Sequence, residues 1–182
     1  MRHFLLVALF FSLIAGSPSG SPVVAAPLAD ETASAPVRIV IEDIGMDRSL
    51  VSVGLDKKRT PIVPKRDVGW YNLSARPGQG ENIVMWGHVL RFRETPKISA
   101  PFARVKELKP GAVIVLYTED GAKHRYVVTK QMRVKPTEVK YILPVGGERL
   151  TLVSCIGDKV IRGGDVKDMT QRLITIAEPA KE

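Results

Sequence analysis

Short strand-like runs separated by turn residues are the feature that most limits the fold of this 182-residue chain. The runs are rich in Val, Ile, Leu and Tyr, whereas glycines, prolines and one Asp-Gly pair stand between them. Many short strands with frequent turn signals indicate a mostly β domain, either a barrel or a sandwich with mainly antiparallel pairing. We predict strands at residues 37–41, 50–53, 82–86, 113–117, 125–129, 150–154 and 172–177.

Helical signals are few in this chain. A short helix is predicted at residues 101–109, where Phe102, Val105 and Leu108 recur at every third position. The Asp-Gly pair at residues 120–121 stands between two predicted strands and therefore predicts a tight hairpin.

The amino terminus has the shape of an export signal. Arg2 and His3 precede an apolar run at residues 4–15, and Gly, Ser and Pro residues follow it. We predict that this segment is a cleaved signal peptide or, if it is retained, a membrane anchor; either way the rest lies on the extracellular face of the membrane. The predicted organisation is a signal or anchor at residues 1–26, a linker at 27–36, one domain at 37–178 and a tail at 179–182.

The chain is basic, with a formal net charge of +8. Anionic lipid, cell-wall polymer and nucleic acid are the partners that such a charge would suit. The Lys and Arg residues are mostly scattered and no aromatic-rich motif accompanies them, so we do not expect nucleic-acid binding. Carboxylates such as Glu94, Glu107 and Asp120 have no recognisable ligand spacing, and we expect neither a metal nor another cofactor.

Cys155 is the single cysteine, and it ends the predicted strand at residues 150–154. In an exported chain this thiol has no disulfide partner and is exposed to oxidation. A catalytic nucleophile would explain its presence, but so would a small buried hydrophobic side chain. Both explanations stay open from the thiol alone.

A nucleophilic thiolate needs a proton donor for the leaving group and a positive group for the developing oxyanion. His88 follows the predicted strand at residues 82–86, whereas His124 is interpreted as a solvated turn residue. Arg172 opens the strand that follows Cys155. We predict that Cys155, His88 and Arg172 converge if their strands are neighbours in a barrel.

These segments resemble the sortases, the cysteine transpeptidases of Gram-positive and related cell surfaces. The sequence TLVSC, which ends at Cys155, resembles the family's TLxTC strand, and RLIT, which begins at Arg172, resembles its RLxV strand. NIVMWGH, which ends at His88, resembles the strand that ends in Gly-His. Ser154 stands where the TLxTC strand has threonine. Ala112 follows Gly111 at a position where the family usually has an acidic residue. Neither departure touches the predicted chemistry.

The resemblance implies a closed eight-stranded barrel with one or two short helices. It implies that Cys155 cleaves an LPXTG-like sorting signal of a secreted protein through a thioester, and that an amine of a cell-wall precursor or a pilin lysine accepts the acyl group. His88 would transfer protons and Arg172 would hold the oxyanion. We expect the segment between residues 134 and 149 and residues near Tyr71 to read the sorting signal. We expect residues 156–171 to form a mobile loop beside the groove.

Two other families of cysteine enzymes and one non-enzymatic function are the alternatives to a sortase. L,D-transpeptidases carry an S-x-G-C-x-R pattern that is absent around Cys155, and papain-like wall hydrolases place their cysteine before their histidine. A non-enzymatic alternative is an exported β-barrel binding or scaffold module in which Cys155 is structural. The sequence does not fix an oligomeric state.

Overall fold

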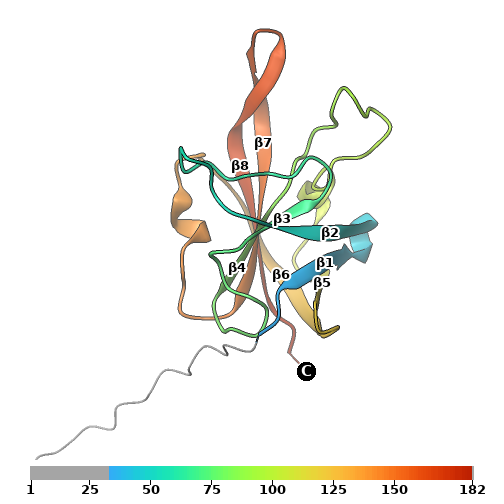
Figure 1. Cartoon of the computed structure of the whole chain (residues 1–182), viewed down its shortest axis with the longest axis vertical. Helices are drawn as coiled ribbons and strands as arrows, with labels where there is room; N and C mark the ends of the chain where they lie inside the picture. Colours follow the sequence, from blue (N-terminus) through green and yellow to red (C-terminus); the bar gives the residue numbers. More distant parts are fainter. Residues whose placement is uncertain (1–32, 182) are drawn as a thin grey trace, which may run out of the picture.

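Eight strands close into one barrel in the computed structural model, which describes residues 33–181 (Figure 1). This confirms the predicted mostly β, eight-stranded barrel. Around the barrel the order is β1-β2-β3-β4-β7-β8-β6-β5. The strands are β1 (Pro36–Ile41), β2 (Met46–Val53), β3 (Val68–Tyr71), β4 (Asn82–Trp86), β5 (Val113–Thr118), β6 (Lys123–Val134), β7 (Arg149–Arg162) and β8 (Asp165–Pro179).

The regular helices of the described residues are short 3-10 turns. They are η1 (Glu42–Ile44), η2 (Val105–Glu107) and η3 (Val139–Ile142). The helix predicted at residues 101–109 is regular only over η2. Its three-residue spacing suits a 3-10 turn, in which side chains three apart lie on one face, and Phe102, Val105 and Leu108 are all buried.

Two strand pairs are parallel, β2 with β3 and β4 with β7, and the other pairs are antiparallel. The register of β4 and β7 runs from Asn82 opposite Arg149 to Trp86 opposite Val153. Because parallel strands point the same way, the carboxyl ends of β4 and β7 lie at the same end of the barrel. This pairing decides where the residues that follow the two strands are placed.

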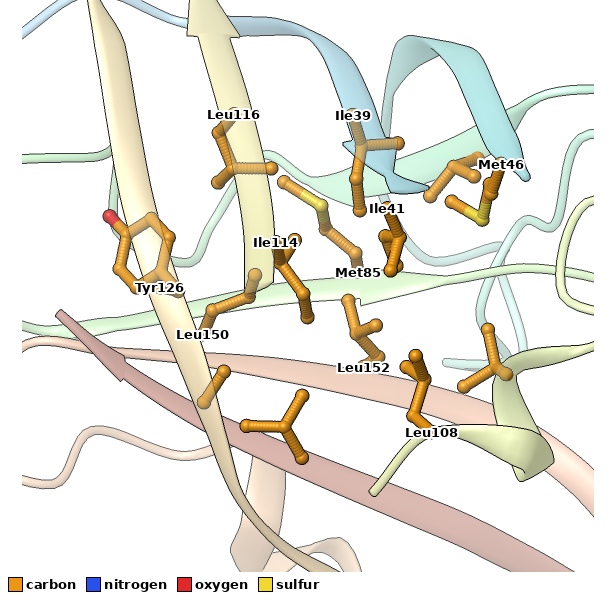
Figure 2. Close-up of a cluster of buried hydrophobic side chains, with 14 of the residues drawn as sticks. Ile39, Ile41, Met46, Met85, Leu108, Ile114, Leu116, Tyr126, Leu150 and Leu152 are labelled. Atoms are coloured by element: carbon orange, nitrogen blue, oxygen red, sulfur yellow. The ribbon is translucent and has the colours of Figure 1, made fainter. Parts of the chain in front are cut away.

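The barrel interior is filled by alternate side chains from its strands, and Figure 2 shows aliphatic side chains from several strands converging there. In β5 the alternation leaves Ile114 and Leu116 fully buried, while their neighbours in sequence are partly exposed. Burying one such side chain contributes about 1.5–3 kcal/mol. Tyr126 is buried among them, and its hydroxyl donates a hydrogen bond to a Glu148 carboxylate oxygen at 2.7 Å.

The prediction of a mobile loop at residues 156–171 is wrong. β7 extends beyond Cys155, and β8 begins well before Arg172. Together they form a two-stranded ribbon that projects from the barrel (Figure 1) and turns at Gly163 and Gly164. Both glycines have positive φ, 60° and 79°, as a two-residue hairpin turn requires. Polar residues on both faces and two register shifts hide the strand pattern in the sequence. We call residues 156–171 the β7–β8 ribbon.

His124 is a strand residue and not the solvated turn residue that we predicted. It lies in β6 opposite Leu116 and is half-buried. The hairpin turn itself is where the sequence predicts it, with the Gly121 amide donating to the Thr118 carbonyl at 2.9 Å. The segment predicted to be a signal or anchor, residues 1–26, lies outside the described residues. From residue 33 to residue 181, no helix has the length and apolar character that a membrane span needs.

Candidate active site

Cys155 and Arg172 are direct cross-strand neighbours. The antiparallel register of β7 and β8 places them opposite each other, so their side chains share one face of the pair. The thiol is free and partly exposed. Cys155 also shares its face of β7 with Val153, which packs in a cluster on the outside of the barrel.

The Arg172 guanidinium is held by acceptors of the β7–β8 ribbon. Nη1 donates to the carbonyls of Met169 at 3.0 Å and Gln171 at 3.2 Å, and Nη2 donates to Asp168 Oδ1 at 2.9 Å. The side chain is 23% exposed, so one part of the guanidinium still meets solvent. Its charge is therefore fixed beside the strand position of Cys155.

His88 reaches the same end of the barrel from β4. The last register pair of β4 and β7 is Trp86 with Val153, and His88 and Cys155 each lie two residues beyond it. His88 therefore follows β4 at the end of the barrel where β7 carries Cys155. Between β4 and His88 the backbone of Gly87 packs closely against Phe102. A Cβ at this position would lie 3.0 Å from Cγ of that buried ring, so glycine suits it.

The position and orientation of His88 are set by three contacts. Its carbonyl accepts a hydrogen bond from the Phe102 amide at 2.8 Å. Its imidazole is hydrogen-bonded to the backbone of Val63 in the β2–β3 segment, and its ring packs edge-on against Phe92 with centroids 4.9 Å apart. A fixed tautomer and ring direction are what a proton-transfer group requires.

Burial favours the uncharged forms of both titrating groups. It raises the pKa of the Cys155 thiol; the nearby Arg172 charge opposes that rise and the Asp168 charge adds to it. Burial also lowers the pKa of the His88 imidazole below its ordinary value of 6.5, and the hydrogen bond to Val63 acts in the opposite direction. At neutral pH the resting site therefore holds mainly a thiol and a neutral imidazole.

An apolar cluster on the outer face of the barrel joins the site to two connecting segments. Val63 of the β2–β3 segment and Ile142 of η3 both pack against Val84 and Trp86 of β4. The Trp86 indole also donates to the Ile62 carbonyl at 2.8 Å. These contacts place the β2–β3 and β6–β7 segments beside the strands that carry the candidate residues.

Asn82 anchors the β6–β7 segment, and our reading of the sequence missed this role. Its buried amide nitrogen donates to the carbonyls of Tyr141 at 3.0 Å and Leu143 at 2.9 Å. Its oxygen accepts from the Thr151 hydroxyl at 2.7 Å. An asparagine that opens an otherwise apolar strand was the available signal, since a buried amide must find partners.

A shallow hollow of about 290 Å³ is lined in part by Ile156 and Leu173, which strand alternation places on the face opposite Cys155 and Arg172. Among residues 33–181, no three His, Cys, Asp or Glu side chains gather as a metal site would require.

Comparison with known proteins extends these observations. A sequence model described as Sortase domain matches residues 39–180. Sortase C-1 from Actinomyces oris is a similar structure, with 22% identity, a TM-score of 0.59 and coverage of 80% of this chain and 73% of that chain. A lid mutant of sortase A from Corynebacterium diphtheriae has 20% identity and a TM-score of 0.62, over 82% of this chain and 72% of that one.

Sortase C1 from Streptococcus agalactiae is similar to the same degree, with 22% identity, a TM-score of 0.61 and coverage of 84% and 70% of the two chains. A search of curated proteins found no match. The structural likenesses support the fold, and the family match spans nearly all of the described barrel. The chain therefore belongs to the sortase family.

Proposed function

We propose that this sortase is a cysteine transpeptidase that cleaves an LPXTG-like sorting signal and transfers the acyl group to an amine. One observation carries the proposal: Cys155 and Arg172 oppose each other across β7 and β8, at the barrel end to which β4 brings His88. A thiol, a cation and an imidazole toward one end of the barrel supply the groups that acyl transfer needs.

In the first half-reaction the Cys155 sulfur attacks the scissile carbonyl carbon. The thiol proton passes to His88, and Arg172 donates hydrogen bonds to the oxyanion. The C–N bond then breaks, His88 gives its proton to the departing amine, and a thioester remains on Cys155.

In the second half-reaction an amine attacks the thioester carbonyl and loses its proton to His88. The new C–N bond forms, the C–S bond breaks, and the thiolate recovers its proton. We infer that the acceptor is an amine of a cell-wall precursor or a pilin lysine. The reaction would take place on the extracellular face of the membrane, with residues 1–26 as the export signal or anchor.

The test is a transpeptidation assay of the full chain with a panel of sorting-signal peptides and triglycine or hydroxylamine as acceptor. Cys155→Ala, His88→Ala and Arg172→Ala should each abolish product while circular dichroism shows an intact fold. His124→Ala is the matched control, because that imidazole lies on β6 away from the site, and it should keep its activity. Undiminished turnover by Cys155→Ala would refute the proposal.

A binding or scaffold module is the alternative, and the partial burial of the Cys155 thiol would suit a structural side chain. A methanethiosulfonate reagent separates the two functions. Rapid labelling of the native chain supports the enzyme, whereas labelling only after denaturation supports the scaffold.

A further inference from the structure

The β7–β8 ribbon carries a carboxylate that belongs to none of the three predicted catalytic groups. Asp168 lies on β8, four residues before Arg172, and its Oδ1 accepts from Arg172 Nη2 at 2.9 Å. Four residues of an extended strand span about 13 Å. The Arg172 side chain must therefore lean along the ribbon, toward its tip, to make this pair.

The Asp168 carboxylate is itself fixed. The same Oδ1 accepts from the Met169 amide at 2.7 Å, so the backbone of β8 holds the carboxylate in place. The acceptors from Asp168, Met169 and Gln171 together engage Nη1 and one side of Nη2. A guanidinium has five N–H donors, and these contacts leave Nε–H and a second Nη2–H available to a ligand.

The charge of Asp168 acts on the same thiol as the charge of Arg172, and in the opposite direction. Asp168 raises the pKa of Cys155, and Arg172 lowers it. The side chains of Arg172 and Asp168 are 23% and 46% exposed, so water screens the pair only in part. The ribbon thus holds the cation in place and moderates its effect on the thiol.

We propose that Asp168 is a positioning residue that fixes the Arg172 guanidinium on the β7–β8 ribbon, on the face of the strand pair that also carries Cys155. The catalytic part of this inference rests on the proposed function: a misplaced guanidinium would stabilise the oxyanion poorly. The part that concerns the thiol does not depend on any sorting signal.

The first experiment follows thiol labelling of the full chain against pH in Asp168→Asn and Asp168→Ala. Asparagine removes the charge but keeps an acceptor for Arg172, whereas alanine removes both. The labelling midpoint should fall in Asp168→Asn, because the opposing charge is gone. It should lie higher in Asp168→Ala than in Asp168→Asn, because the unanchored guanidinium no longer stays beside the thiolate.

The same pair of variants in an Arg172→Ala background isolates the role of the arginine. There the Asn and Ala variants should label alike, because the only difference between them acts through Arg172. Identical midpoints in the native background, or an equal difference in both backgrounds, would overturn the proposal. Asp165→Asn is the matched control, since Asp165 also lies on the ribbon but pairs with Arg93 and Lys167, and its midpoint should not move.

The second experiment measures steady-state acyl transfer. Asp168→Ala should lower kcat by about tenfold or more with little change in KM, as expected for a displaced transition-state contact. If the native chain is active and Asp168→Ala has the same kcat, the proposed effect of Asp168 on catalysis is overturned. If the native chain turns over no peptide, the proposed function fails, and the labelling experiment alone decides the role of Asp168.

Discussion

At the scale of single residues, His88 couples the stability of the fold to pH. Its pKa in the folded chain is below the ordinary value of 6.5, because burial disfavours the imidazolium. As the pH falls below about 6.5, the unfolded chain therefore takes up a proton before the folded chain does. The native chain should lose stability in that range as the pH decreases.

The substitution His88→Gln should remove this part of the pH dependence. Glutamine does not titrate, and its amide still offers a donor toward Val63. The free energy of unfolding, measured by urea titration between pH 5 and 8, should vary less with pH than in the native chain. His124→Gln controls for loss of an imidazole outside the site. An unchanged pH slope in His88→Gln would contradict the assignment.

Gly87 is a second residue whose identity is fixed by close packing. A Cβ there would lie 3.0–3.2 Å from three ring atoms of Phe102, which is 1% exposed and cannot move aside. Gly87→Ala should lower the free energy of unfolding by about 1–3 kcal/mol, the usual cost of overpacking. It should also slow labelling of Cys155 if His88 assists deprotonation. Gly147→Ala is the control, because no atom lies within 4 Å of its added Cβ, and it should be nearly neutral.

At the scale of elements, β4 does more than carry His88, because its first residue fixes the segment between β6 and β7. The Asn82 amide holds two carbonyls of that segment, and Glu81 accepts hydrogen bonds from the amides of Val145 and Gly146. The segment that we expect to read the sorting signal is thus held against the start of β4 by hydrogen bonds that need no bound peptide. Such preorganisation lowers the ordering cost of binding.

Asn82→Ala tests this anchoring. The variant removes one donor from the carbonyls of Tyr141 and Leu143 and the acceptor of the buried Thr151 hydroxyl, and it should cost about 2 kcal/mol or more. Hydrogen exchange followed by mass spectrometry should show faster exchange at residues 138–146, and the KM for peptide should rise more than kcat falls. Asn72→Ala, at an exposed position, should change neither. Unaltered protection of the segment would argue against the anchor.

At the scale of the whole molecule, local pattern predicted a mostly β domain, the resemblance to the sortases implied the closed barrel, and long-range pairing decided the parts that both missed. β3 escaped prediction because it has four residues, one of them glycine, and is defined by its pairing with β2 and β4. The β7–β8 ribbon has no buried face, so its sequence lacks the alternation of a barrel strand. The sequence could predict that Cys155 and Arg172 are neighbours, provided that their strands adjoin. The roles of Asp168 and Asn82 depend on contacts that appear only once the strand register is known.

The two ends of the barrel have different roles: one carries a hydrogen-bond network that stabilises the fold, and the other carries the candidate active site. Glu148, at the amino end of β7, accepts hydrogen bonds from the Tyr126 hydroxyl at 2.7 Å and from the amides of Gly78 and Gly80 at 3.2 and 3.1 Å. It thereby ties together β6, the segment before β4 and the start of β7. Cys155 lies toward the other end of β7. Changes at the Glu148 network should therefore alter the stability of the barrel without altering the thiol.

Tyr126→Phe isolates this network with the ring left in place. Loss of a hydrogen bond to a charged group should lower the free energy of unfolding by about 1.5–3 kcal/mol, measured by urea denaturation. The rate of Cys155 labelling at neutral pH should stay unchanged. In the background of Glu148→Gln the same substitution should cost less, because the charge that strengthened the bond has gone. A labelling rate that changed in step with stability would mean that the two ends are coupled and that the barrel does not act as a rigid support for the site.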